Sequence, residues 1–456
     1  MVNPTLDKHQ ELDATLYRPI YETGKGFYIT MAVLVAIILW ALYMYSTQLR
    51  EGLGVTGMNQ PITWGFYIVN FVFFIGISHA GTLISAILRL SKAEWRRPIT
   101  RMAEIITVIV LAIGGLSPII DLGRPDRLLH IYESGRLQSP LLWDVTSITA
   151  YFTASTVYLY IPMIPDIARL RDRGGKLKWA YTFMAWGWQG TERQKRVLNR
   201  AINVLMVMVI PIAVSVHTVI SYIFSMTLQP GWHSTIFGPY FVVGAIFSGI
   251  AALLIVMIFF RRFYHLEGYL KEIHFQYLGT LLLVMSLLWF YFTFSEYLTG
   301  YFGAEPHETQ IIMYKFSGPF AIFFWAMVLC NFVIPVVILS FRKFKTIPGV
   351  LIASIAVVIG MWLERLIIVV PSLANPRMDL PLGIYIPSFV EWSLFAGGIA
   401  VFILGYMLFA KFFPIISLWE IEEARTEGIR EVKERIHKYL PGDEDFQESI
   451  QTIAKP

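Results

Sequence analysis

The chain has 456 residues, of which 56% are hydrophobic and only 15% are charged. Soluble domains carry about 25% charged residues, and the mean hydropathy here is +0.58, so the composition excludes a soluble enzyme. The net charge of +5 does not indicate nucleic-acid binding, because in a membrane protein the distribution of Lys and Arg between loops carries the information. One cysteine, Cys330, excludes an intrachain disulfide and an iron–sulfur cluster held by this chain alone.

The hydrophobic residues form uninterrupted blocks of roughly 20 to 30 residues, long enough to cross a hydrocarbon core about 30 Å thick. Residues 1–26 lack the apolar core and cleavage site of a secretory signal peptide, so we expect the first block to remain as a true span. Because a backbone in lipid must satisfy its own hydrogen bonds, the blocks predict helices. We place about ten spans, at 27–46, 61–90, 99–120, 140–165, 198–227, 237–260, 273–301, 312–341, 346–370 and 388–413.

Basic residues alternate between rich and poor loops along the chain. The loops rich in Lys and Arg are 89–101, 166–197, 261–271 and 342–345. The loops with few or none are 47–60, 121–139, 228–236, 302–311 and 371–387. The positive-inside rule then places the rich loops and both termini on the cytoplasmic side of the membrane. The loop 166–197 combines cations with three tryptophans, which fits either an interfacial, lipid-contacting helix or a solvated loop.

An internal repeat is indicated by the pattern Gly-x-Tyr-x-Val, which occurs at Gly65 and again at Gly238, 173 residues later. The same offset brings the third and fourth spans close to the seventh and eighth. We therefore predict an all-α membrane protein with two four-helix bundles in parallel repeat and two flanking helices. The predicted segments are a cytoplasmic N-terminus 1–26, flanking helix and outer loop 27–60, bundle one 61–227, bundle two 237–371, flanking helix 388–413 and a charged cytoplasmic tail 414–456.

Ionisable side chains at membrane depth cost roughly 2.5–3.5 kcal/mol each, so they are usually paired or face a cavity. Most of those predicted here fall in the outer half, with His79 near mid-depth and Glu104 towards the cytoplasm. The alternative for each is a buried salt bridge or an interfacial side chain, and for His79 a packing seam of small residues. The residues are His79, Glu104, Asp121, Asp144, His217, Glu296, Lys315, Glu364, Arg365 and Glu391.

The turn after the third span contains Pro118, Gly123 and Pro125, which break the helix and shape a tight exit. Asp121 and Arg124 are placed to pair across this turn. Such a pair is either a structural clamp or part of the wall of a pocket.

Two kinds of redox ligand are compatible with these residues. A bis-histidine haem needs two facing histidines at similar depth, and His79 and His217 are the candidate pair, with His274 near the cytoplasmic end of its span. A quinone needs an apolar pocket with a partner that exchanges protons, a role that suits histidine beside a carboxylate. We favour the quinone. Its electrons must then leave to a cofactor on another subunit.

Three segments resemble the NrfD/PsrC family of quinone-interacting membrane subunits: GISHAGTLISAI at 76–87, DLGRP at 121–125 and SPLLWD at 139–144. Within that family, the ten-span pattern and the long basic loop before the fifth span are most similar to the ActC subunit of alternative complex III. The resemblance implies menaquinone or another quinone as substrate, with iron–sulfur clusters and haem c on partner subunits. The implied partners are a periplasmic iron–sulfur subunit, multi-haem cytochrome c subunits, a second NrfD-like membrane subunit and lipids.

The expected site residues follow partly from the family motifs and partly from the predicted depth of each side chain in the membrane. The motif match gives the quinol-site role to His79, Asp121 and Arg124, with Ser78 as a lesser contact. Depth adds Asp144 and His217 as quinone contacts. The side chains expected along a proton path are Glu104, Glu296, Lys315, Glu364 and Arg365.

The leading hypothesis is therefore a quinol-oxidising membrane subunit of an electron-transfer complex, with quinol oxidised near the outer face and proton conduction as a possible further role. A secondary proton or ion transporter is the first alternative, although short, Gly/Pro-broken helix pairs are lacking at matching positions. The second is a scaffold or proton path without a quinol site, like the sister subunit ActF.

Overall fold

The computed structural model describes residues 16–424 except 176 and 379, together with residue 426. Throughout this part the regular structure is helical and no strand occurs. The first fifteen residues and most of the predicted charged tail, 427–456, lie outside the described residues.

Nine helices of the described part are long and apolar enough to cross a membrane. They coincide with nine of the ten predicted spans, which confirms an all-α, multi-pass membrane protein. Each satisfies its backbone internally, as lipid requires. They are α2 (Lys25–Glu51), α3–η2–α4 (Phe66–Leu90), α5 (Thr100–Asp121), α10 (Glu192–Ser225), α11 (Phe237–Phe263), α12 (Glu272–Gly303), α14–η6–α15 (Ala321–Ser340), α16 (Ile347–Ala374) and α17 (Phe389–Phe412).

The predicted span 140–165 corresponds to α7 (Pro140–Tyr160), which is less hydrophobic than these nine. Its 21 residues extend about 31 Å at 1.5 Å per residue, and it packs against α10 and α5. Polar side chains recur along its buried side, including Tyr151, Ser155 and Tyr158. The helix therefore belongs to the bundle, and its polar stripe accounts for its low hydropathy.

Two membrane helices contain a π-helical turn. α3 (Phe66–His79) passes through η2 (Ala80–Ile84) into α4 (Ser85–Leu90), and α14 (Ala321–Val328) passes through η6 (Leu329–Val333) into α15 (Ile334–Ser340). Pro335 follows the second turn and lacks the N–H that a regular helix needs. Turns of this kind are frequent at functional sites, and the first begins directly after His79.

One predicted boundary was wrong. The span expected at 312–341 starts too early, because residues 306–316 form a separate helix, α13 (Pro306–Phe316). Pro306 starts α13, as proline commonly does at a first helical turn, and the chain turns at Gly318 before α14 begins. Lys315 therefore lies on α13 and outside the membrane-spanning segment.

Short helices connect the long ones. They are η1 (Leu53–Val55), η3 (Glu94–Arg96), η4 (Pro125–Arg127), α6 (His130–Glu133), η5 (Ile161–Met163), α8 (Ile164–Arg173) and α9 (Lys178–Met184). The loop 166–197 thus contains part of α8 and all of α9. α9 leaves Trp179, Phe183 and nearby Trp186 exposed, as expected of an interfacial segment.

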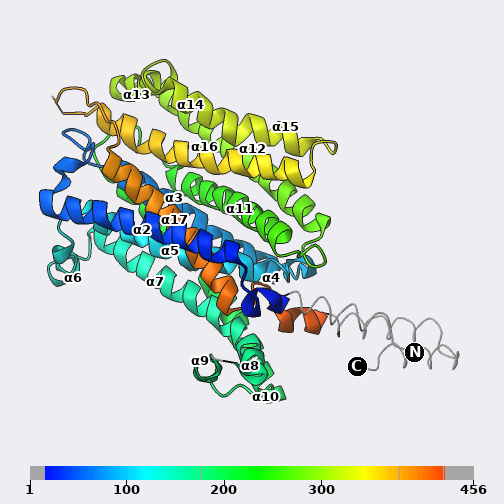
Figure 1. Ribbon diagram of the computed structural model, residues 1–456. Helices are drawn as coiled ribbons and strands as arrows, with labels where there is room; N and C mark the ends of the chain where they lie inside the picture. The colour runs from blue at the N-terminus through cyan, green and yellow to red at the C-terminus, as the bar shows by residue number, and fades with distance from the viewer. Residues whose placement is uncertain (1–15, 176, 379, 425, 427–456) are drawn as a thin grey trace, which may run out of the picture.

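Figure 1 shows the long helices running side by side between two ends. At one end, which we call the basic end, α4 and α15 end and α8 and α9 lie. The chain at the helix ends there contains Arg89, Arg101, Arg261 and Lys345. The other, the loop end, is formed by 52–65, 122–139, 226–236, 304–320 and 375–388. That the basic end faces the cytoplasm stays a prediction from loop charge.

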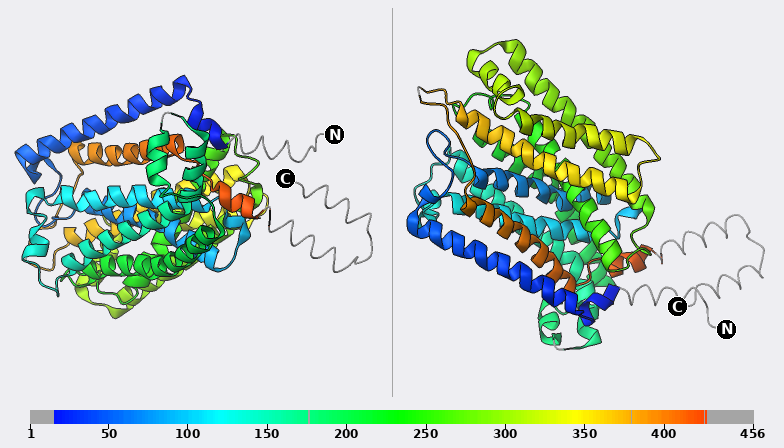
Figure 2. Two further views of the ribbon diagram at one scale, coloured as in Figure 1. Left: turned by 90° about the horizontal axis from the view of Figure 1, so that it is seen from below. Right: turned by 45° about the horizontal axis from the view of Figure 1, so that its top comes forward.

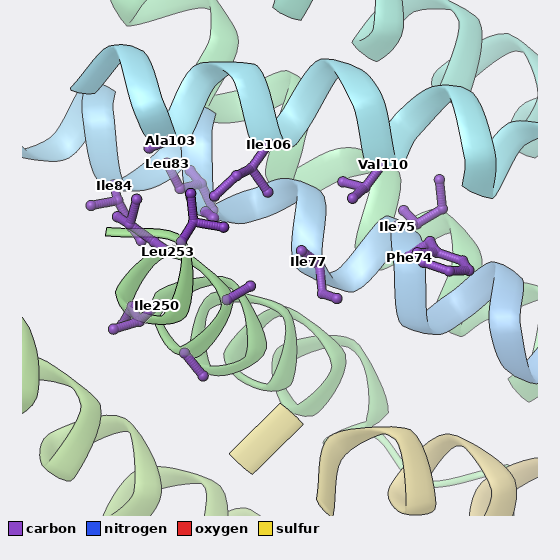
Figure 3. Packing of buried hydrophobic residues seen from close by; sticks show 14 of the residues in the cluster. Phe74, Ile75, Ile77, Leu83, Ile84, Ala103, Ile106, Val110, Ile250 and Leu253 are labelled. Carbon is purple, nitrogen blue, oxygen red and sulfur yellow. The ribbon is translucent and has the colours of Figure 1, made fainter. Parts of the chain in front are cut away.

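α3, α11 and α16 form the centre of the bundle, since most side chains in their membrane-spanning stretches are buried. α2 and α17 pack against each other on one flank, while α14 and α15 lie on the opposite side (Figure 2). Figure 3 shows apolar side chains of α3, η2, α5 and α11 meeting between the helices, among them Ile77, Val110 and Leu253.

The helices that pack together follow the order of the chain. α5 contacts α3 and α7, and α7 contacts α10; separately, α11 contacts α12 and α16, and α15 contacts α16. The central contact between the two groups runs through α3 and α11. A repeat of two four-helix units stays a prediction.

Candidate functional site

His79 is the last residue of α3 and is fully buried. Its Nε2 lies 2.8 Å from the carbonyl oxygen of Ala213 on α10. Because a carbonyl only accepts hydrogen bonds, Nε2 carries the proton in this contact. Nδ1 lies 3.3 Å from the Ile75 carbonyl oxygen and 3.5 Å from Ser78 Oγ, so both nitrogens of the ring have neighbours within the bundle.

Glycines allow the helices to approach closely around this histidine. A Cβ at Gly81 would lie 2.1 Å from the Ala103 carbonyl oxygen of α5, and one at Gly249 would lie 2.6 Å from the backbone nitrogen of Ala80. The Gly81 N–H also donates to Thr107 Oγ1 at 2.9 Å. The small residues that follow His79 in the sequence therefore form a packing seam and position the imidazole at the same time.

A second buried histidine faces the first. The His79 and His217 rings, from α3 and α10, lie edge to face with their centroids 3.9 Å apart. Neither ring nitrogen of His217 has a hydrogen-bond partner among the described residues. With metal–nitrogen bonds of about 2 Å on each side, an iron between the rings would hold their centroids farther apart, so the geometry disfavours the bis-histidine haem.

An ion pair from the second half of the chain reaches this histidine pair. Arg365 and Glu364 are adjacent on α16, with Nη1 and Oε2 3.1 Å apart, and both side chains are buried. Trp289 Nε1 donates to the other oxygen of Glu364 at 2.6 Å. A Cβ at Gly244 would lie 2.8 Å from Arg365 Nη2, so this glycine provides the space for the guanidinium. A Cβ at Gly76, three residues before His79, would lie 4.0 Å from Arg365 Nη2, so the guanidinium lies beside the helix that carries His79.

From Glu364 a row of polar groups continues to the loop end. Tyr240 contacts Glu364, and the ring of Tyr297 lies 5.6 Å from Lys315 Nζ. Tyr240, Tyr297, Lys315 and Glu296 line a cavity of about 30 Å³ at that end. One oxygen of Glu296 is buried without a hydrogen-bond partner in the described part of the chain.

In the other direction the row continues along α7. Tyr151 hydrogen-bonds to Thr82 and donates to the Ser78 carbonyl oxygen at 3.2 Å. Tyr151, Ser155 and Tyr158 are spaced i, i+4 and i+7, which places them on one face of the helix. Tyr158 lies 3.2 Å from Ser85 Oγ.

Ser85 Oγ donates to Glu104 at 2.7 Å, near the basic end. We call the row from Glu104 through the two histidines to Lys315 the polar file. Its members, in order, are Glu104, Ser85, Tyr158, Ser155, Tyr151, His79, His217, Arg365, Glu364, Tyr240, Tyr297, Glu296 and Lys315.

The basic end of the file is covered by the chain that follows α17. Glu420 accepts from Arg89 at 2.8 Å and from Arg96 at 2.9 Å, and is 3% exposed. Arg101 donates to Asp166 at 2.7 Å, and both are buried. These contacts fix residues 414–421 across the ends of α4 and α5.

Asp121 lies at the other end of α5, away from the histidines. One of its carboxylate oxygens is buried and has no hydrogen-bond partner among the described residues. The preceding residue, Ile120, lines a cavity of about 150 Å³ between α2, α3, α5 and α17, which we call the ring cavity. Its few polar lining groups are Tyr45, Tyr67, Asn70 and Ser117.

Tyr67 is held in place by Gln48, which joins α2 to α3 and α5. The Tyr67 hydroxyl donates to Gln48 Oε1 at 2.6 Å, and Gln48 Nε2 donates to the Ile120 carbonyl oxygen at 2.9 Å. Gln48 is 1% exposed. A buried amide in an otherwise apolar helix thus orients one polar edge of the ring cavity.

The expected pair of Asp121 with Arg124 is not formed. Arg124 lies beyond the turn at Gly123, where φ is +64°, and donates two hydrogen bonds to Asp126 at 3.0 and 2.9 Å. Both partners are exposed. The reversal of the chain at the left-handed glycine carries the guanidinium outward, away from the carboxylate.

The remaining residues that the sequence predicted as site residues or membrane charges lie in different parts of the structure. Asp144, in the first turns of α7, is buried with one oxygen lacking a partner in the described residues. Glu391 caps α17 and accepts from the Gly57 backbone at 2.7 Å, so its role is structural. Ser78 and His217 lie with His79, whereas Asp121 and Arg124 do not.

Sequence reasoning missed the neutral polar residues of the ring cavity and of the polar file. Gln48, Tyr67 and Asn70 carry no charge, and a search for ionisable groups passes over them. Tyr151 and Tyr158 were likewise absent from the predicted path. Their i, i+7 spacing on the least hydrophobic predicted span was the available signal.

Comparison with known proteins agrees with this fold. The profile of the family described as "Polysulphide reductase, NrfD" matches residues 54–376. The chain belongs to the NrfD family. This confirms the resemblance to the NrfD/PsrC family of quinone-interacting membrane subunits that the motifs indicated.

The curated relatives of this NrfD-family chain are similar along nearly their whole length. A putative membrane subunit of dimethyl sulfoxide reductase from Halobacterium salinarum is 25% identical, covering 88% of this chain and 95% of the relative. A selenate reductase subunit from Mesobacillus selenatarsenatis is 25% identical (86% and 95%). The Hdr-like menaquinol oxidoreductase integral membrane subunit of Archaeoglobus fulgidus is 23% identical (88% and 96%). All three names describe subunits of reductases or oxidoreductases.

Proposed function

We propose that this chain is the quinol-oxidising membrane subunit of an electron-transfer complex and that the quinol ring binds in the ring cavity beside Asp121. The single observation that carries the proposal is the buried, unpartnered carboxylate oxygen of Asp121, the residue that directly follows Ile120 in the wall of this cavity. A cavity of about 150 Å³ holds one six-membered aromatic ring in a well-studied lysozyme variant. The volume therefore suits the head of a quinone.

The chemistry follows from the groups at the cavity. A quinol donates hydrogen bonds through its hydroxyls, and an ionised carboxylate is an acceptor that can take a proton. When the quinol becomes a quinone it loses two protons and two electrons. Asp121 receives the two protons one at a time and releases each to water at the loop end, and the two electrons pass to a redox centre on a partner subunit there. Tyr45 and Ser117 supply hydroxyls that can donate to the carbonyl oxygens of the product.

The relatives support a quinone as the substrate, because one of them is named as a menaquinol oxidoreductase subunit. We propose menaquinone or a similar quinone for this chain, and iron–sulfur and haem c subunits as its partners, as in the ActC arrangement of alternative complex III. The loop end is the proposed docking face. We propose that the chain lies in a bacterial inner membrane with the basic end on the cytoplasmic side, so that the loop end faces the periplasm.

A matched pair of variants of the purified complex tests this proposal. Asp121→Asn keeps the size of the side chain but removes the proton acceptor, so quinol-driven reduction of the partner's redox centre is expected to fall at least about a hundredfold. Asp126→Asn, five residues on and exposed, is the control and keeps wild-type turnover. Equal activity in both variants would exclude Asp121 as the acceptor.

We also propose that the polar file conducts protons across the membrane during turnover. Its support is the row of polar groups from Glu104 to Lys315, in which internal water can join the unpartnered atoms of Ser155, His217, Arg365 and Glu364. It includes the five residues of the predicted path. His79 and His217 act here, at mid-depth, while quinol chemistry takes place at the ring cavity.

Proteoliposomes separate this second role from the first. His217→Leu is expected to stop proton movement coupled to turnover, while quinol oxidation at the ring cavity continues. Proton flux through the isolated wild-type chain without quinone would instead favour the transporter alternative. A complex that assembles fully but shows no quinol oxidation would favour the scaffold.

A further inference from the structure

A second cavity of about 400 Å³ lies beside the ring cavity, between α3, α5, α11, α16 and α17. Its walls are apolar and aromatic throughout, and include Phe73 and Ile77 of α3 and Val256 of α11. Phe73 and Ile77 lie in the middle of their span, whereas Trp392, the fourth residue of α17, brings the cavity towards the loop end. We call it the apolar cavity.

The two cavities meet at two aromatic rings. Phe74 and Phe395 line both, and their ring centroids are 6.2 Å apart. A hydrogen bond also joins the two sites: Trp362 Nε1, in the wall of the apolar cavity, donates at 2.9 Å to Asn70 Oδ1 in the wall of the ring cavity. The polar edge of one cavity therefore continues directly into the apolar wall of the other.

The apolar cavity also reaches the surface of the bundle. Ile359 of α16 is 51% exposed, and Trp392 and Ile399 of α17 are 47% and 40% exposed, although all three line the cavity. A chain-like ligand that starts at the ring cavity can thus pass Phe74 and Phe395, cross the apolar cavity and leave between α16 and α17.

We propose that the apolar cavity binds the isoprenoid tail of the quinone whose ring occupies the ring cavity, an inference that rests on the proposed function. The ring cavity, at about 150 Å³, is too small to hold a quinone head and a long tail together, whereas about 400 Å³ lies in the usual range for ligand pockets. A wall without polar groups favours a hydrocarbon chain, which has no hydrogen bonds to satisfy.

The neighbouring ring cavity favours an isoprenoid tail over the acyl chain of a phospholipid. A phospholipid keeps its charged headgroup at the membrane surface, so its chains reach the apolar cavity from the side, between α16 and α17, and leave the ring cavity unfilled. Here the polar groups nearest to the apolar cavity belong to the ring cavity, inside the helices. An uncharged quinone ring can occupy that place, while a phosphate headgroup would be buried without a paired charge.

Binding of the tail predicts a specific kinetic pattern. The tail takes no part in the chemistry, so its contacts stabilise the bound substrate and the transition state equally. Loss of the tail site therefore raises KM for a long-tailed quinol and leaves kcat unchanged. A quinol without a tail is unaffected.

The test uses the complete complex with two probes, long-tailed menaquinol and tailless menadiol. Ala252→Trp fills the apolar cavity from α11 and is expected to raise KM for menaquinol about tenfold, with kcat and all constants for menadiol unchanged. The control is Val207→Trp, on an exposed face of α10. An equal change with both probes, or no change with either, would overturn the proposal.

Two smaller substitutions test the same proposal if Ala252→Trp prevents assembly of the complex. Ile359→Ala and Ile399→Ala widen the mouth of the cavity at exposed positions, and both are expected to raise KM for menaquinol only. Asp121→Asn in parallel keeps the two proposals distinguishable, because it reduces kcat with both probes if the ring site is correct. Full activity of Asp121→Asn would contradict the ring site itself, and unchanged KM in the isoleucine variants would contradict the tail site alone.

Discussion

The imidazole rings of His79 and His217 face each other edge to face, with their centroids 3.9 Å apart, where α3 meets α10 in the centre of the bundle. His79 donates a hydrogen bond to α10, while neither nitrogen of His217 has a partner in the described structure. On one side of the pair the polar file continues to Glu364 and on the other to Tyr151. The histidine pair therefore joins the two halves of the polar file.

Replacing His79 by leucine is expected to have two separable effects. Loss of the Nε2 hydrogen bond to Ala213 lowers the free energy of unfolding by about 1 kcal/mol, the net value of a typical hydrogen bond. Proton movement coupled to turnover falls by a factor of about 100 or more, because a positioned proton carrier is lost. Thermal unfolding in detergent and a pH-indicating dye in proteoliposomes measure the two effects. His130→Leu, exposed on α6, is the control, and equal proton movement in both variants would contradict the role of His79.

Gly81→Ala tests the packing seam that positions the histidine. The added Cβ would lie 2.1 Å from the Ala103 carbonyl oxygen, a backbone atom that cannot swing aside. We expect the variant to assemble poorly and to lose at least about 2 kcal/mol of stability, in the range of overpacked cores. Gly26→Ala is the matched control, since nothing lies within 4 Å of its Cβ position. Expression level and melting temperature distinguish them, and a normal Gly81→Ala protein would refute the close contact.

Glu420→Gln tests the closure of the basic end. The change leaves Arg89 and Arg96 without their carboxylate and is expected to cost about 3–5 kcal/mol, as when one member of a buried ion pair is removed. Glu422→Gln, exposed and paired with Arg169, should cost less than about 1 kcal/mol. Equal melting temperatures for the two variants would contradict the buried network.

The same network predicts a dependence on pH. Burial alone would raise the pKa of Glu420, but Arg89 and Arg96 act more strongly together and hold the pKa below its ordinary value of 4.5. A carboxyl group whose pKa is depressed by folding stabilises the folded state above its unfolded pKa and loses that effect as pH falls through the folded pKa. The stability difference between wild type and Glu420→Gln should thus be full at neutral pH and shrink below about pH 4.5.

The variant Arg124→Gln tests whether this side chain contributes to the stability of the chain or to docking of a partner. Its bonds to Asp126 are exposed, so Arg124→Gln is expected to leave the melting temperature of the isolated chain unchanged. If the loop end is the docking face, the same variant weakens association with the periplasmic partner. Co-purification at increasing salt measures this, with Arg136→Gln on the same end as the comparison. Unaltered association of Arg124→Gln would remove Arg124 from the interface.

The sequence predicted the fold well because lipid restricts the possible structures. Nine of ten spans are confirmed by helices of membrane length, and the tenth coincides with α7, whose polar stripe lowers its hydropathy. The boundary at 312 was wrong since α13 is apolar enough to resemble the start of a span. Hydrophobicity alone does not reveal that the chain turns at Gly318 before the next helix begins.

The candidate sites were only partly predictable. Depth and charge identified His79, His217 and Asp121, but not that the first two lie together and the third apart. That separation depends on how helices rotate against each other, which is set by close contacts such as the one at Gly81. The Arg124 prediction failed because one left-handed glycine reverses the chain between the two charges.

Photolabelling is the most direct measurement of where the quinone ring binds. The intact complex is illuminated with a ring-azido menaquinone analogue, and the labelled peptides are identified by mass spectrometry, with excess menaquinone as competitor. The expected label lies on α2, α3 or α5 around Tyr45, Tyr67 and Ser117, and it disappears with competitor. Competitor-sensitive label confined to the helices around His79 and His217, with none at the ring cavity, would contradict the assignment.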